Sequence, residues 1–195
     1  MSHDSISALG SMEFSRYPNL EILYLDNNPI GNNIHPSAFN GTEIERVYLD
    51  GTGMTSIPSA IKVLSDAHLY LALLHNPGLG DNIKPTDFEG MNIYVLDLEN
   101  TGMTSIPTAL LNLNNSLEAL LLWDNPLVDV SVLPQLMAAS NTLTYIDITA
   151  TTLAIFPEYE VAMAMCRPDA PSYDIYIYDV SVNHWFDIFL AKTMQ

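Results

Sequence analysis

The chain repeats itself along its length, at intervals of about 24 and about 49 residues. The seven residues 52–58 recur in the same order as residues 101–107. Segment 34–41 likewise returns as segment 83–90, with its Ile, Pro, Phe and Gly in register. A unit of this size can bury only one of its sides when it folds alone. The repetition therefore predicts units that stack on one another and share a continuous core.

One pattern of eleven positions underlies every unit. Positions 1, 4, 6 and 11 are apolar, position 9 is Asn or Thr, and the remaining positions are free. The six clear units open at Leu20, Ile44, Leu69 (or His68), Ile93, Leu117 and Leu143. Their polar column reads Asn28, Thr52, Asn76, Thr101, Asn125 and Thr151. A seventh, weaker copy reads Ile175, Tyr178, Val180, Asn183 and Trp185.

The alternation of apolar and free positions has the period of two that a strand needs, so each unit is expected to begin with a short strand. The Asn or Thr that follows the strand is expected to bond the backbone of adjoining turns. Farther along, residues 59–65 and 108–115 come after an Ile-Pro pair and predict short helical returns.

These units resemble the leucine-rich repeat family, whose motif L-x-x-L-x-L-x-x-N-x-L they fit from about Leu20 to Trp185. The resemblance implies an α/β fold: a right-handed, curved solenoid with a parallel β-sheet on the concave face and short helices and turns on the convex face. A unit near 24 residues with Phe39 and Phe88 in the return limb is similar to the typical subclass. Thr in every second unit and the lack of a Cys-rich cap depart from the family pattern.

Three regions follow from this alignment: residues 1–19 as a partial repeat or an N-terminal cap, residues 20–166 as six repeats, and residues 167–195 as the degenerate seventh repeat with a C-terminal cap. Leu9 and Phe14 are separated by the same interval as Ile34 and Phe39. The chain therefore opens partway through a unit, which favours a fragment of a longer protein over a dedicated cap.

Composition narrows the possible partners. The 195 residues carry 23 acidic and only 6 basic side chains, a formal net charge of −17, and the basic residues are scattered. Nucleic acid and anionic membrane surfaces are therefore not expected as main partners. No apolar run is long enough for membrane insertion, and residues 1–16 do not have the pattern of a signal peptide. The resemblance alone favours an extracellular or cell-surface location.

By the resemblance, the free positions beside the second and third apolar residues point out of the concave face, where such proteins usually bind their ligands. The candidate ligand-binding residues are Tyr24, Asp26, Arg46, Tyr48, Asp50, Tyr70, Leu74, Asp97, Glu99, Leu121, Trp123, Tyr145 and Asp147. An outward Trp among Leu, Tyr and Asp is typical of a binding hot spot, and the acidic face favours a protein or peptide with a basic patch. The alternatives are that Trp123 lies under a neighbouring loop and that Asp26 and Asp50 only solvate the face.

The sequence offers little for catalysis. It has no G-x-S-x-G or H-E-x-x-H motif and no Gly-rich phosphate loop, and its single cysteine, Cys166, excludes an internal disulfide and a thiolate zinc cluster. No catalytic residue, cofactor or metal ligand is therefore expected. The predicted function is non-enzymatic ligand recognition. Two alternatives are a structural or adhesive surface protein that self-assembles and the sensor fragment of a larger receptor or enzyme.

Overall fold

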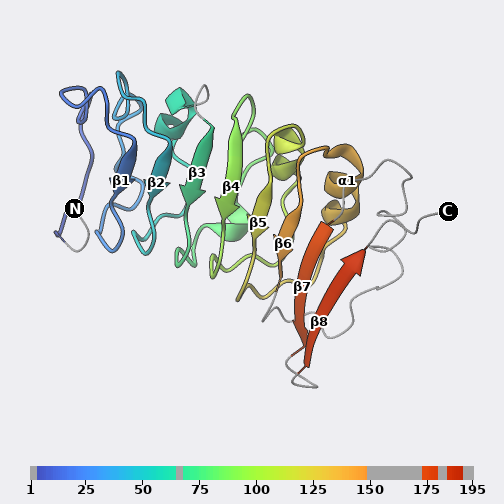
Figure 1. Cartoon of the computed structure of the whole chain (residues 1–195). Helices are drawn as coiled ribbons and strands as arrows, with labels where there is room; N and C mark the ends of the chain where they lie inside the picture. The colour runs from blue at the N-terminus through green and yellow to red at the C-terminus, as the bar shows by residue number, and fades with distance from the viewer. Residues whose placement is uncertain (1–3, 65–67, 149–172, 180–183, 191–195) are drawn as a thin grey trace.

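A computed structural model describes residues 4–64, 68–148, 173–179 and 184–190. Eight strands form one sheet in sequence order, as Figure 1 shows. They are β1 (Ile22–Tyr24), β2 (Arg46–Tyr48), β3 (Leu69–Ala72), β4 (Ile93–Asp97), β5 (Ala119–Leu121), β6 (Tyr145–Asp147), β7 (Tyr173–Asp179) and β8 (His184–Leu190). Strands β1 to β7 are parallel, and β8 is antiparallel to β7. Thr151, Cys166, Val180 and Asn183 lie outside the described residues.

The sheet places its apolar residues on one side, as the period of two predicts. The second and third apolar residues of all six clear units are buried, with exposed fractions of at most 4%. In the third unit the opening residue is Leu69 and not His68, because Leu69 is buried and paired with Ile93. That unit has one residue fewer before its second apolar position, and the pairing of β3 with β4 is irregular between Leu69 and Tyr70.

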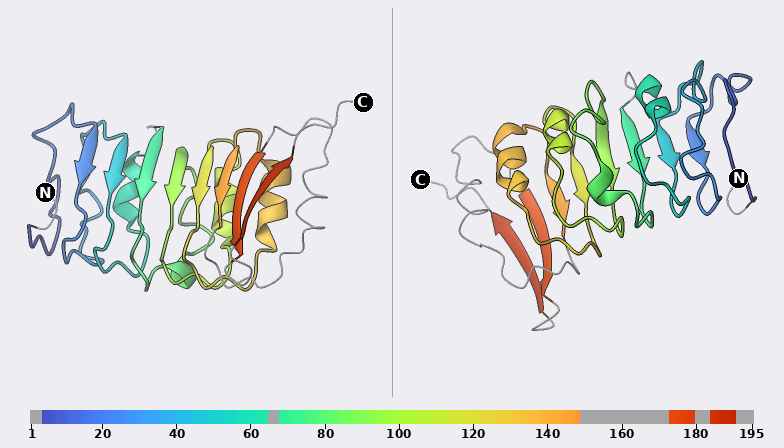
Figure 2. Two further views of the ribbon diagram at one scale, coloured as in Figure 1. Left: turned by 60° about the horizontal axis from the view of Figure 1, so that its bottom comes forward. Right: turned by 180° about the vertical axis from the view of Figure 1, so that it is seen from behind.

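The return limbs close the core from the other side. Two predicted helical returns are present as the 3-10 helices η1 (Ser59–Leu64) and η3 (Thr108–Leu113), each of which buries three apolar side chains. The other helical elements of the described residues are a short 3-10 turn, η2 (Gly80–Asn82), and the helix α1 (Val132–Ala139). Helices η1, η3 and α1 lie on one side of the strand row (Figure 2). The predicted α/β solenoid, with a parallel sheet and short helical returns, is confirmed.

The N-terminal segment continues the stack. Leu9 forms a parallel bridge with Ile34, and the Phe14 ring stacks on the Phe39 ring with centroids 6.0 Å apart. Both pairs join residues that match in the repeat alignment. Leu9 and Phe14 therefore pack on Ile34 and Phe39 in the register of the repeat.

The seventh copy differs from its predicted alignment. The sequence placed Ile175 at the opening position, but the sheet pairs Ile175 with Ile146, which is the second apolar position of the sixth unit. The predicted register was therefore wrong by three residues. Trp185 was also misassigned: the sequence placed it at the last apolar position of the seventh copy, but it lies in β8, paired with Tyr178 of β7 in an antiparallel hairpin. Seven-residue strands satisfy their backbone groups by pairing with each other, which a degenerate motif does not reveal.

Neighbouring coils are joined by two kinds of polar clamp that alternate. We number the coils 1 to 6 by their opening residues, Leu20, Ile44, Leu69, Ile93, Leu117 and Leu143. Between coils 2 and 3 the clamp is buried: Asn76 accepts from the Thr52 hydroxyl at 3.3 Å and donates to the Leu49 carbonyl at 3.0 Å. Asn125 clamps Thr101 in the same way between coils 4 and 5.

Two of the other junctions carry clamps at the surface. Between coils 1 and 2, the side chain of Asn32 bonds both the amide and the hydroxyl of Thr55, at 3.0 and 2.7 Å. Between coils 3 and 4, Asp81 accepts from the amide and the hydroxyl of Thr104, at 2.8 and 2.7 Å. Because buried and surface clamps alternate, the repeating structural block is two coils long, which explains the interval of about 49 residues.

Candidate functional site

Columns of side chains cross the sheet face that is turned away from the core, which we call the open face. The first column is Ile22, Arg46, Tyr70, Val95, Ala119 and Tyr145, and the second is Tyr24, Tyr48, Ala72, Asp97, Leu121 and Asp147. Each member is paired in register with the next member of its column. Residues of one column therefore lie side by side on neighbouring strands.

A third column continues just beyond the strand ends. It consists of Asp26, Asp50, Leu74, Glu99 and Trp123. Within it, the amide that follows Asp26, Asp50, Leu74 and Glu99 donates to the carbonyl of the corresponding residue one coil farther on, at 2.7 to 3.0 Å. All thirteen candidate residues therefore belong to one ordered surface.

Exposure differs within this surface. Tyr24 is 49% exposed and Trp123 is 38% exposed, so Trp123 is not covered by a neighbouring loop. Ala72 and Asp97 are buried, with exposed fractions of 1% and 7%. The open face therefore combines buried side chains, such as Ala72 and Asp97, with larger side chains that are exposed, such as Tyr24 and Trp123.

An aromatic ladder crosses the first four strands diagonally. It consists of Tyr24, Tyr48, Tyr70, Tyr94 and His68. Successive tyrosine ring centroids lie 4.6, 5.3 and 6.3 Å apart, and His68 lies 4.4 Å from Tyr94. These distances are those of stacked and edge-on aromatic pairs. The ladder is a continuous π surface, partly open to solvent.

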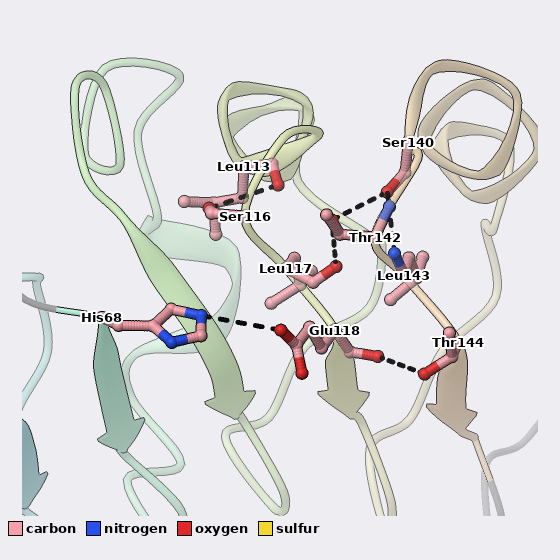
Figure 3. A network of polar contacts seen from close by, with 9 residues as sticks. All are labelled: His68, Leu113, Ser116, Leu117, Glu118, Ser140, Thr142, Leu143 and Thr144. Carbon is pink, nitrogen blue, oxygen red and sulfur yellow. Dashed lines mark hydrogen bonds and ion pairs between the residues drawn. The ribbon is translucent and has the colours of Figure 1, made fainter.

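The upper end of the ladder is fixed by an ion pair that spans a strand. His68 precedes β3 and Glu118 precedes β5, and their side chains meet at 3.6 Å (Figure 3). The Glu118 carbonyl also accepts a bond from the Thr144 hydroxyl at 3.3 Å. Since both side chains of the pair are more than half exposed, this contact orients the His68 ring and adds little stability.

The carboxyl groups of the open face are partly desolvated and repel one another. Burial, with the charges of Asp97 and Asp26, raises the pKa of Asp50 to about 7, against a lowering effect of a hydrogen bond with the Leu74 backbone. Burial likewise raises the pKa of Asp97 and of Glu99. One Asp50 oxygen, Oδ1, is buried and makes no hydrogen bond with a described residue. The same environment raises the pKa of Tyr70 to about 12, through burial first and Asp97 second.

This arrangement predicts that the protein loses stability as the pH rises. The folded pKa of Asp50 lies above its unfolded value of 3.8, so its contribution to stability is lost as the pH rises between these two values. We therefore expect the melting temperature to fall as the pH rises from about 4 to about 7. Asp50→Asn should reduce that fall and raise the free energy of unfolding at pH 8 by on the order of 1 to 2 kcal/mol after allowance for solvent screening.

Thermal unfolding of both chains across this pH range measures the effect. Asp129→Asn is the matched control, because bonds from Ser131 lower the pKa of that exposed carboxyl. An equally steep fall in the wild type and in Asp50→Asn would contradict the assignment.

Tyr94 and His68 were missed as members of this surface by the sequence columns. The available signal was the length of the third unit: one residue separates Leu69 from Leu71, whereas two separate Ile93 from Leu96. Tyr94 is an extra residue relative to β3, and its ring lies against Tyr70 and His68. Unequal spacing before the second apolar position could therefore have identified it.

A family model for the leucine-rich repeat matches residues 19–41, which comprise coil 1 and its return limb. The same residue pattern and coil geometry continue through the parallel sheet. The chain is a leucine-rich repeat protein. No curated protein matches it.

Leucine-rich repeats in general serve as protein-interaction modules, and the family is generally non-enzymatic. In the part of the chain that the structure describes, no three His, Cys, Asp or Glu side chains are grouped to hold a metal ion. The same residues contain no helix long and apolar enough to cross a membrane.

Proposed function

We propose that the open face of this leucine-rich repeat protein binds a protein or peptide with a basic patch, without catalysing a reaction. The observation that carries the proposal is the placement of the aromatic ladder beside carboxyl groups that are partly removed from water. Aromatic rings offer large contact areas at low entropic cost, and a cation meeting the ring faces and the carboxyl groups gains from both.

Charge supports this choice of partner. The only Lys or Arg in the three columns is Arg46, against Asp26, Asp50, Asp97, Glu99 and Asp147. A net charge of −17 adds a long-range field of the same sign. A basic partner is therefore expected to associate faster at low salt than at high salt.

Selection from a random peptide library against the immobilised protein tests this function. We expect enrichment of Lys and Arg, and we expect the double variant Tyr48→Ala with Trp123→Ala to weaken binding of the selected peptides at least about tenfold, as the loss of hot-spot aromatics does. The melting temperature of the variant should change little, because both side chains are partly exposed.

The matched control is Tyr17→Ala with Val128→Ala, which removes two exposed apolar side chains outside the columns. Selected peptides without an excess of basic residues, or peptides that bind the Tyr48 and Trp123 variant as well as the wild type, would refute the proposal. Sedimentation over a range of concentrations tests the self-assembly alternative, which requires growth of the sedimenting species with concentration. The sensor-fragment alternative is tested by sequencing the flanking DNA, because that alternative requires the coding sequence to continue into a receptor or enzyme domain.

A further inference from the structure

In the second and third columns of the open face, the polarity of the side chains changes from one coil to the next. From coil 2 onward, coils 2, 4 and 6 present carboxyl groups there and coils 3 and 5 present apolar side chains, whereas coil 1 presents Asp26 and does not follow the alternation. The acidic members are Asp50, Asp97, Glu99 and Asp147, and the apolar members are Ala72, Leu74, Leu121 and Trp123. This alternation has the same two-coil period as the clamps between coils.

The strand register turns the alternation into a fixed spacing. Ala72 pairs with Asp97, Asp97 with Leu121, and Leu121 with Asp147, without an intervening shift. Neighbouring strands are about 4.8 Å apart, so Asp97 and Asp147 in the second column are separated by roughly 10 Å, and so are Asp50 and Glu99 in the third column. The apolar side chains lie midway between them.

These carboxyl groups lack the solvation that isolated acids have. Asp97 is 7% exposed, and Oδ1 of Asp50 is buried without a hydrogen-bond partner among the described residues. A cation that reaches them replaces lost water and relieves the repulsion between acids. The exposed Trp123 ring and Leu74 meanwhile offer apolar area between the charges.

An extended ligand can match this spacing in one common backbone conformation. A polyproline II chain rises about 3.1 Å per residue with three residues per turn, so every third side chain points the same way at intervals of roughly 9 Å. In a β-strand, side chains on one face recur every two residues, at roughly 7 Å, and every third residue points away. The acidic spacing therefore fits the polyproline II repeat better.

We propose that the ligand is an extended segment that crosses the strands in a polyproline II conformation, with Lys or Arg at every third residue facing Asp50, the pair Asp97 and Glu99, and Asp147. This inference rests on the proposed function and specifies its partner. One intervening side chain in each turn lies over Leu74 or Trp123. Arg is favoured at the Asp50 end, because the planar guanidinium stacks on rings such as Tyr48 and Tyr24.

Three synthetic peptides of identical composition test the spacing. Each carries three Arg residues in a Pro and Ala background, placed at every second, every third or every fourth position, and isothermal titration calorimetry measures their affinity for the whole chain. We expect the peptide with Arg at every third position to bind at least about tenfold more tightly than the other two. The double variant Asp97→Asn with Glu99→Gln should remove that advantage.

Glu43→Gln with Glu89→Gln is the charge-matched control, because both acids are exposed and lie outside the columns. It should leave the spacing preference intact. Equal affinities for the three peptides, together with weaker binding to the Tyr48→Ala, Trp123→Ala variant, would overturn the spacing and leave the proposed function standing. Failure of all three peptides while library-selected peptides bind the open face would also overturn the spacing alone. Failure of every basic peptide, selected or designed, would overturn both.

Discussion

Asn125→Ala is expected to lower the free energy of unfolding by about 3 to 5 kcal/mol, through buried groups left without partners. The Asn125 side chain is 1% exposed. Its oxygen accepts bonds from Thr101 and from the Met103 amide, and its nitrogen donates to the carbonyls of Leu98 and Leu122 at 2.8 and 2.9 Å. Alanine satisfies none of these groups, and they belong to two different coils. Chemical denaturation measured by circular dichroism gives the change.

Thr101→Val is the matched control on the other side of the same clamp. The Thr101 hydroxyl donates to the Leu98 carbonyl at 2.9 Å and contacts the Asn125 oxygen at 3.1 Å. Valine removes both bonds but keeps the volume, and Asn125 retains its bonds to the backbone. We expect a loss of about 1 to 2 kcal/mol. A smaller effect for Asn125→Ala than for Thr101→Val would show that the clamp is not centred on the asparagine.

Gly102→Ala is expected to cost about 2 to 4 kcal/mol, because an added methyl group has no room and the backbone is left-handed. The φ angle of Gly102 is +77°, and a Cβ atom there would overlap the carbonyl oxygen of Pro77 in the preceding coil. The overlap is with backbone, so a side-chain rotation cannot relieve it. Thermal and chemical denaturation report the loss.

The other copy of the same motif supplies the control. Gly53 stands in the same sequence context, with φ +75°, but a Cβ atom there would have nothing within 4 Å. Gly53→Ala therefore carries only the strain of the left-handed backbone, on the order of 1 kcal/mol. Equal losses at the two glycines would mean that the approach of Pro77 does not limit the packing of coils 3 and 4.

Much of this fold could be predicted from the sequence, because stacking forces equivalent residues to meet equivalent surroundings. The buried apolar positions and the polar column recur at fixed intervals, so Leu98 or Asn76 can be placed from its motif alone. The three columns of the open face follow from the same register.

Features that break the repeat could not be predicted in this way. The hairpin of β7 and β8 depends on antiparallel pairing between residues that the motif places within one unit, such as Tyr178 and Trp185. The diagonal contact of Tyr94 with Tyr70 depends on a missing residue in coil 3, and the raised pKa of Asp50 depends on burial and on charges from other coils. These properties arise from three-dimensional neighbours and not from the position within a unit.

The alternating clamps constrain how such a chain can change its length. Excising one coil would bring two asparagines or two threonines together in the polar column and would remove a contact of the kind that joins Asn76 to Thr52 and Asn125 to Thr101. Excising or duplicating an adjacent pair of coils preserves every partner. Duplication and deletion should therefore lengthen or shorten this architecture in steps of two coils. The identical copies of T-G-M-T-S-I-P at 52–58 and 101–107 have the separation that one such duplication would leave.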